Sequence, residues 1–161
     1  MPVESPTMSQ EHPAPLSAAA EAALTASACA FALAQCRTVA VVGLSPKTHR
    51  DSYEVAEYLQ RQGWRIVPVN PVAAASGQPI LGERVYATLT EAAAAEKIDL
   101  VNVFRNSNDV PPIVDEAIAI DAPAVWLQLG VLNDAAVAKA RAAGLRAVQN
   151  RCLLVEHRKH T

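Results

Sequence analysis

Three basic residues, Lys47, Arg50 and Arg105, follow two short β-branched segments of the sequence. Lysine and arginine donate charge-assisted hydrogen bonds, so three of them close together would bind the phosphates of a ligand. The first of these segments is also followed by a turn residue, Gly43, and by two hydroxyl donors, Ser45 and Ser52. Any one of the cations alone is equally an ordinary solvated charge. The hypothesis of a phosphorylated ligand therefore depends on all three meeting at one place.

Five short apolar runs are typical of strands that are buried on both faces of a sheet. They are Thr38–Val42, Arg65–Val69, Asp99–Phe104, Ala124–Leu127 and Arg146–Val148. Helical patterns separate the runs, over Asp51–Gly63 with Asp51 and Glu54 spaced as a capping box, Thr88–Ala95, Val110–Ile120 and Asn133–Gly144 with Asn133 as cap. This alternation predicts an α/β fold with a doubly wound parallel sheet.

The order of the strands decides where a ligand would bind. We expect the Rossmann-like order 3-2-1-4-5-6, in which Val85–Tyr86 supplies an extra edge strand. In such a sheet the ligand lies outside the carboxyl ends of the strands, where the order reverses, here between the first strand and Leu100–Phe104. Lys47, Arg50 and Arg105 then project towards one crevice.

The N-terminal part of the chain differs in composition from the rest. Residues 1–15 are rich in proline and polar residues, and we expect a disordered tail there. Residues 16–37 are rich in alanine and free of proline and glycine, which predicts a helix capped by Ser17. This helix packs either on the single domain of residues 38–161 or on a second copy of the chain. A homo-oligomer is therefore one of the possible states.

Composition argues against several classes of partner. The net charge is −2, from 14 Lys and Arg against 16 Asp and Glu, which disfavours a nucleic-acid surface or a polybasic membrane patch. We expect no apolar run near the roughly 18 residues that span a membrane, and the start, Met1 to Glu4, lacks the cationic region of a secretory signal. Three cysteines without a CxxC spacing indicate reduced thiols. We therefore expect a cytoplasmic protein.

Common nucleotide-binding motifs are absent from the sequence. Where a dinucleotide fold has GxGxxG, this chain has the single glycine Gly43, and Asn70 stands where the ribose-binding acid is expected. The GxxxxGK[ST] spacing of a nucleoside triphosphatase is missing as well. NAD binding and ATP hydrolysis are therefore disfavoured.

Catalytic groups are not indicated by spacing either. The four histidines, His12, His49, His157 and His160, have no serine or cysteine placed by the sequence to form a triad. Cys152 with His157 and His160 does not have the spacing of a zinc site. From the residues alone, binding is predicted rather than catalysis.

Six motifs occur in a fixed order along the predicted domain. They are Val42 to Lys47 with Arg50 to Tyr53, Pro68 to Pro71, Ile80 to Gly82, Val103 to Arg105, Trp126 to Gly130, and Asn150 to Cys152 with Glu156 and His157. Together they resemble the small, stand-alone CoA-binding protein family. The Rossmann-like domain of that family is similar to the N-terminal domain of the succinyl-CoA synthetase alpha subunit.

The resemblance implies coenzyme A or an acyl-CoA as the ligand, with its phosphates on the loop from Gly43 to Ser52. The implied binding residues are Gly43, Leu44, Ser45, Pro46, Lys47, Arg50, Ser52, Asn70, Pro71, Phe104, Arg105, Gln128, Leu129 and Gly130. The synthetases phosphorylate a histidine in a separate domain, for which this chain has no room, so we expect a non-catalytic sensor, carrier or regulatory module. Two alternatives stay open: a thiol, acyl-transfer or redox enzyme that uses Cys152, and a generic nucleotide-binding domain that serves another subunit.

Overall fold

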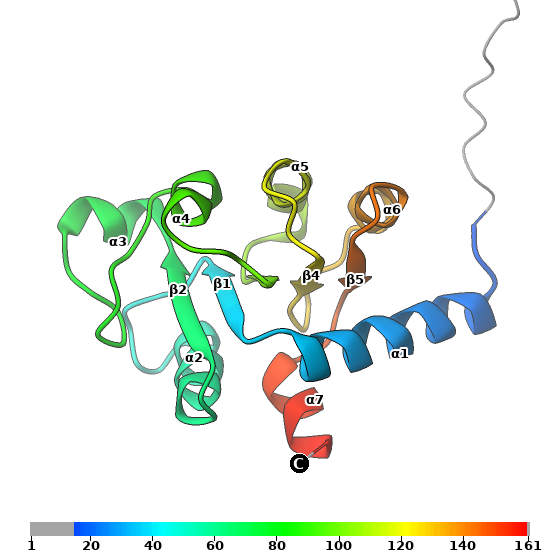
Figure 1. Cartoon of the computed structure of the whole chain (residues 1–161), viewed down its shortest axis with the longest axis horizontal. Helices are drawn as coiled ribbons and strands as arrows, with labels where there is room; N and C mark the ends of the chain where they lie inside the picture. The colour runs from blue at the N-terminus through cyan, green and yellow to red at the C-terminus, as the bar shows by residue number, and fades with distance from the viewer. Residues whose placement is uncertain (1–14, 161) are drawn as a thin grey trace, which may run out of the picture.

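The computed structural model describes residues 15–160, so the predicted tail falls almost entirely outside the described residues. Five parallel strands form one sheet in the order β2-β1-β3-β4-β5 (Figure 1). The strands are β1 (Thr38–Val42), β2 (Arg65–Val69), β3 (Leu100–Val103), β4 (Ala124–Leu127) and β5 (Arg146–Val148). The predicted doubly wound α/β fold is confirmed, and the strand order reverses between β1 and β3, as expected.

The expected sixth strand is reduced to a single bridge at the edge of the sheet. Tyr86 pairs in parallel with Val69, beside β2. The N–H of Tyr86 donates to the carbonyl oxygen of Pro68 at 3.0 Å, and the carbonyl of Tyr86 accepts from the N–H of Asn70 at 2.9 Å. The pairing extends no further because Pro68 has no N–H to donate and Asn70 already caps a helix.

Helices cover both faces of the sheet (Figure 1). One face is covered by α4 (Leu89–Ala95), α5 (Val110–Ala119) and α6 (Asp134–Ala142), and the other by α1 (Ala18–Gln35), α2 (Asp51–Arg61) and α7 (Leu153–Lys159). Two short helices, α3 (Pro71–Ser76) and the 3₁₀ turn η1 (Ser107–Asp109), follow β2 and β3. Neither α3 nor α7 was predicted from the sequence.

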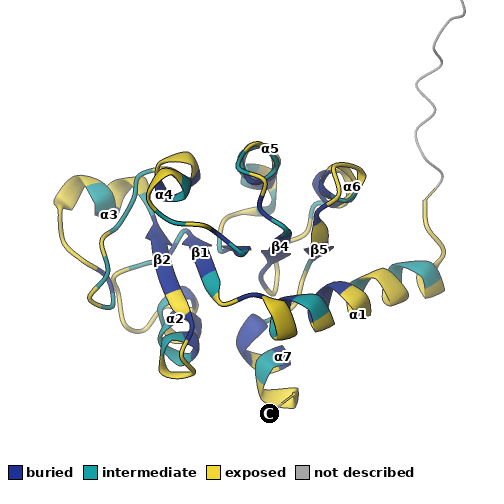
Figure 2. Ribbon diagram, in the orientation of Figure 1, coloured by how far each residue is buried: buried dark blue, intermediate teal, exposed yellow. Residues whose placement is uncertain are grey.

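The strands divide their side chains between two cores. Ala40 and Val42 of β1 belong to the core under α4, α5 and α6, whereas Val39 and Val41 belong to the core under α1, α2 and α7. Figure 2 shows the strands buried along most of their length. Successive strand residues point to opposite faces, so a sheet covered on both faces needs apolar residues without alternation.

The predicted helix caps are confirmed except at α2. The side chains of Ser17 and Asn133 accept hydrogen bonds from backbone N–H groups of the first turns of α1 and α6, at 3.1 and 3.0 Å. At α2 the predicted capping box is wrong, because Asp51 is already the first helical residue. Arg50, in an extended conformation, occupies the cap position and makes no side-chain cap bond there.

The N-terminal helix α1 packs through part of its surface on the domain. Ala28, Cys29 and Ala32 are buried beside β5 and α7, while the first turns are mostly exposed (Figure 2). With 18 residues and a mean hydropathy of 1.2, α1 is long and apolar enough by length and composition to cross a membrane, which is weak evidence for such a role. The sequence-based expectation that no apolar run of about 18 residues occurs was therefore wrong, because the many alanines of α1 raise its mean hydropathy.

Candidate functional site

A cavity of about 870 Å³, here called the main cavity, opens at the carboxyl ends of β1 to β4. Residues that directly follow these strands line it, among them Gly43 after β1, Asn70 after β2, Phe104 after β3 and Gln128 after β4. The strand order reverses at this edge of the sheet, and ligands of open α/β sheets bind at such a reversal. The volume is that of an ordinary small-molecule site.

The structure brings about half of the predicted residues together around the main cavity. The six that line it are Gly43, Asn70, Phe104, Arg105, Gln128 and Leu129. Pro71 lines a neighbouring side cavity of about 250 Å³, which shares Gly43, Arg105 and Asp109 with the main cavity.

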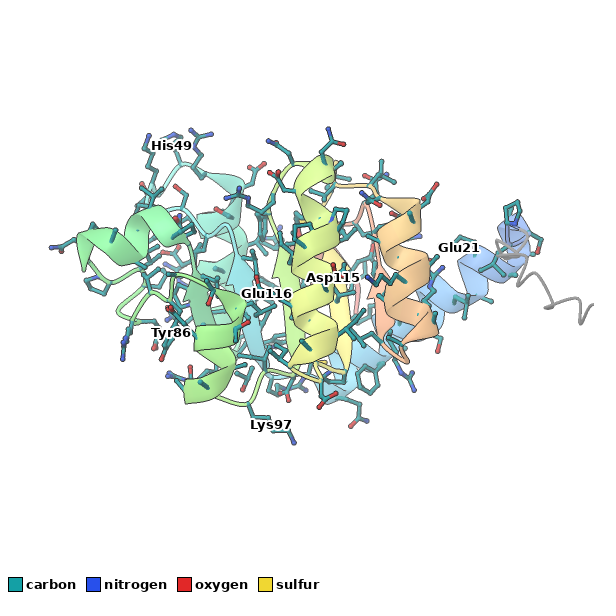
Figure 3. The ribbon with its side chains drawn as sticks, turned by 90° about the horizontal axis from the view of Figure 1, so that it is seen from above. Glu21, His49, Tyr86, Lys97, Asp115 and Glu116 are labelled. Carbon is teal, nitrogen blue, oxygen red and sulfur yellow. The ribbon has the colours of Figure 1, made fainter. Side chains whose placement is uncertain are left out.

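The other predicted residues lie around the main cavity without lining it. They are Leu44, Ser45, Pro46, Lys47, Arg50, Ser52 and Gly130. The side chain of Leu44 is 0% exposed and packs in the core, so only its backbone could reach a ligand. Lys47 and Arg50 are exposed, and Figure 3 shows His49, which lies between them in the sequence, at the edge of the molecule.

Hydrogen bonds within the chain hold the loop after β1 in place. The Oγ of Ser52 accepts from the N–H of Ser45 at 3.0 Å, and the Oγ of Ser45 accepts from the N–H of Lys47 at 3.1 Å. The side-chain amide of Asn70 donates to the carbonyl oxygen of Leu44 at 2.9 Å. The serines that the sequence offered as ligand donors therefore also order the loop.

The main cavity carries charges of both signs. Arg105 and Arg158 line it, together with the carboxylates of Asp51, Glu54 and Asp109. Nη2 of Arg105 lies 3.5 Å from Oδ2 of Asp109, in an exposed ion pair of the kind that contributes little stability. Sequence reasoning missed the two acidic residues of α2, because it assigned them to a capping box. Their position one turn apart on a helix face was the available signal.

The wall of the main cavity that α7 supplies was also missed. Leu154, Val155 and Arg158 line the main cavity from this helix, and Cys152 lines it from the preceding residue. The signal was the apolar pair that begins at Leu153, followed by cationic residues as at a helix C-terminus. The sequence placed Asn150 to Cys152, Glu156 and His157 in one of the six motifs, but no helix was predicted over them.

The helix α7 is anchored on α2 through His157. Nδ1 of His157 lies 2.7 Å from the hydroxyl of Tyr58, and the imidazole also meets the rings of Tyr58 and Trp64 edge-on, with centroids 5.4 and 5.9 Å apart. Burial among these rings, and the nearby charges of Arg37 and His160, lower the pKa of His157. The imidazole therefore supports the wall of the main cavity in its neutral form.

Buried polar groups lie beneath the main cavity. Asn102 of β3 is 0% exposed and donates from Nδ2 to the carbonyl oxygen of Trp126 at 3.2 Å. Oε1 of Gln128 accepts from the N–H of Leu153 at 3.4 Å, which ties the start of α7 to the end of β4. Among the described residues, no partner is found for Oδ1 of Asn102. Gln128 thus serves both the cavity wall and the internal packing.

The three cysteines differ in accessibility. Cys29 and Cys36 are buried in the core, and burial raises the pKa of both thiols, that of Cys36 to about 12. Cys152 is half-buried and lines the main cavity. Within residues 15–160, no group of three His, Cys, Asp or Glu side chains is arranged to hold a metal ion.

Known proteins resemble this chain over most of its length. It is 34% identical over 125 residues to the uncharacterized protein YneT of Bacillus subtilis, covering 78% of this chain and 88% of YneT. A hypothetical protein from Pyrococcus horikoshii OT3 has a TM-score of 0.75 and 34% identity, covering 81% of this chain and 88% of that one. A Thermus thermophilus structure, cell-free ID.343, has a TM-score of 0.75 and 33% identity, with coverages of 80% and 93%.

The family match covers the sheet and every segment that lines the main cavity. Residues 37–158 match the CoA binding domain family, from the residue before β1 to the penultimate residue of α7. The match spans the six motifs on which the resemblance was founded. This chain belongs to the CoA binding domain family.

Proposed function

We propose that the protein binds coenzyme A or an acyl-CoA in the main cavity and acts in the cytoplasm as a non-catalytic sensor, carrier or regulatory module. One observation carries the proposal: the main cavity opens where the strand order reverses, inside the segment that matches the CoA binding domain family. The side cavity adjoins it at Gly43, Arg105 and Asp109, so the two together offer room for a long ligand. The partner is a small molecule rather than a nucleic acid or a membrane.

The phosphates of CoA bind on the side of the main cavity that begins at Gly43. Arg105 lines both the main and the side cavity, so its guanidinium reaches a phosphate in either. Lys47 and Arg50 approach from the exposed side of the loop, where a ligand phosphate outside the main cavity would meet them.

The carboxylates restrict where those phosphates lie. Asp51 and Glu54 repel a phosphate placed deep against α2, so the negative groups of CoA stay near Arg105 and the loop. The other end of the main cavity presents the aliphatic side chains of Leu129, Leu154 and Val155 beside Arg158, and these aliphatic side chains suit the pantetheine arm. The ligand therefore runs from the loop after β1 towards α7.

Calorimetric titration of the full chain with CoA, NAD and ATP tests the proposal. We expect heat of binding with CoA, and no displacement of bound CoA by NAD or ATP. Removal of the ribose phosphate, in dephospho-CoA, should weaken binding because one charge-assisted contact is lost. No binding of CoA together with binding of NAD would favour the generic nucleotide-binding domain instead.

The enzyme alternative rests on Cys152, which lines the main cavity and is half-buried. A steady-state assay for thiol release from acyl-CoA separates it from the binding module. We expect no turnover above that of the Cys152→Ser variant. Turnover that requires Cys152 would make the protein an acyl-transfer or redox enzyme.

A further inference from the structure

An open groove adjoins the main cavity at its α7 end. This outer groove, of about 470 Å³, lies between α1, the segment after β4 and the segment that joins β5 to α7. Leu129, Cys152 and Val155 line both the outer groove and the main cavity, so the two spaces adjoin at these residues. A ligand that extends from the main cavity past these side chains would reach the outer groove.

The outer groove exposes aliphatic side chains that the fold leaves uncovered. Leu129 is 66% exposed, Leu132 48% and Val155 44%. Within the described part of the chain these are three of six exposed large hydrophobic residues, and all three line this groove. Clustering of this kind marks a surface for an apolar partner, whereas scattered exposed residues need no explanation.

Most of the polar side chains of the outer groove already have partners within the protein. Both Nη atoms of Arg141 hold the carboxylate of Glu21, at 2.7 and 3.0 Å. Glu156 accepts from two cationic side chains, and Oδ1 of Asn150 accepts from the N–H of Gly130 at 2.8 Å. The surface that remains to be covered is aliphatic, so the outer groove suits a hydrocarbon chain better than a second charged group.

We propose that the outer groove binds the acyl chain of an aliphatic acyl-CoA, so that the protein prefers a fatty acyl thioester to free CoA. This inference rests on the proposed function, because the CoA moiety must occupy the main cavity with its sulfur end towards Cys152. The acyl chain passes between Leu129 and Val155 and ends against Leu132. Each fully buried methylene tightens binding about fourfold, and a groove open to water on one side gives a smaller gain per methylene.

Titration of the full chain with CoA, acetyl-CoA and octanoyl-CoA, each below its micelle-forming concentration, tests this inference. We expect octanoyl-CoA to bind about tenfold more tightly than acetyl-CoA. Leu132→Ser should remove most of this gain and leave the affinity for CoA unchanged, because Leu132 lines the outer groove but not the main cavity. The matched control is Val72→Ser, which removes an aliphatic side chain 80% exposed on α3 and should keep the full gain.

The outcomes separate this inference from the proposed function. If CoA binds and octanoyl-CoA binds no better than acetyl-CoA, the outer groove does not take an acyl chain, and the proposed function stands. If neither CoA nor its thioesters bind, both fail. Sedimentation of the same variants tests whether a second copy of the chain covers the outer groove instead. A dimer that Leu132→Ser dissociates, together with equal affinities for acetyl-CoA and octanoyl-CoA, would overturn the inference.

Discussion

Gly43 lies so close to the backbone of Phe104 that a methyl group does not fit between them. A Cβ built on Gly43 would overlap the carbonyl oxygen of Phe104 and would lie 3.1 Å from Cδ of Arg105. The φ of Gly43 is 89°, in the region that favours glycine. The contact joins the ends of β1 and β3, between which the main cavity opens. Glycine is thus required here both for its backbone conformation and for the close approach.

Gly43→Ala should destabilise the protein more than an alanine at another glycine with positive φ. We expect a loss of about 1–3 kcal/mol in the free energy of unfolding from backbone strain, and a further loss from the overlap with Phe104. The matched control is Gly77→Ala, since Gly77 has a φ of 72° and no atom within 4 Å of a built Cβ. Urea denaturation of both variants measures the difference. Equal losses would show that β3 moves aside at little cost.

Arg50→Ala and Lys47→Ala should each weaken CoA binding by about tenfold, since a charge-assisted hydrogen bond contributes roughly 1.5–3 kcal/mol. Arg105→Ala should weaken binding at least as much, because Arg105 lines both cavities and its exposed ion pair with Asp109, at 3.5 Å, competes only weakly with a phosphate. The affinity of the wild type should also fall as salt rises. Calorimetric titration of CoA at low and high salt measures these changes.

The matched control is Lys97→Ala, which removes a cation at the opposite end of the molecule from His49 and the loop after β1 (Figure 3). Its affinity for CoA should equal that of the wild type. A loss as large as that of Arg50→Ala would mean that net charge, rather than a local phosphate site, sets the affinity.

The sheet was predictable because its signals are local. Each strand is a short apolar run, and the segments after β1, β3 and β4 were recognised as cavity-lining before the structure showed Gly43, Arg105 and Gln128 around one space. The strand order followed from general rules for parallel crossovers. The strands and the segments that follow them could therefore be predicted, because neighbouring residues along the chain specify them.

The missed parts of the site depend on contacts between distant segments. The helix α7 has only seven residues, and its position depends on His157 meeting Tyr58, 99 residues earlier in the chain. Helices this short are marginal without tertiary packing, so their local pattern is weak. The spacing of Asp51 and Glu54 fits a capping box, but it fits a helix that begins at Asp51 equally well. The path of the preceding loop decides which of these two arrangements forms.

Oxidised CoA should form one mixed disulfide with the protein, at Cys152. The Cys152 thiolate attacks the disulfide, one CoA half stays bound to the protein, and the other half leaves as CoA thiolate. Cys29 and Cys36 are buried with raised pKa values, so they supply little accessible thiolate. Intact-mass measurement should show a single adduct, which Cys152→Ser abolishes and Cys29→Ala retains. No adduct, or one that survives Cys152→Ser, would refute the assignment.

The stability of the protein should fall as the pH drops below about 6.5, the ordinary pKa of histidine. Burial, then the charges of Arg37 and His160, lower the pKa of His157 in the folded state. Between that lowered pKa and 6.5 the unfolded chain binds more protons than the folded one, so acid favours unfolding. The contribution of neutral His157 is complete above pH 6.5 and is lost as the pH falls towards its folded pKa.

Thermal melting of wild type and His157→Gln, at about pH 7.5 and about pH 5.5, checks this expectation. The variant should melt lower than the wild type at the higher pH, because the contacts with Tyr58 and Trp64 are altered, and it should lose less on acidification. His49→Gln, in the exposed loop after β1, should keep the pH dependence of the wild type. If His157→Gln loses as much stability as the wild type, the acid sensitivity arises elsewhere and α7 is held independently of the charge on His157.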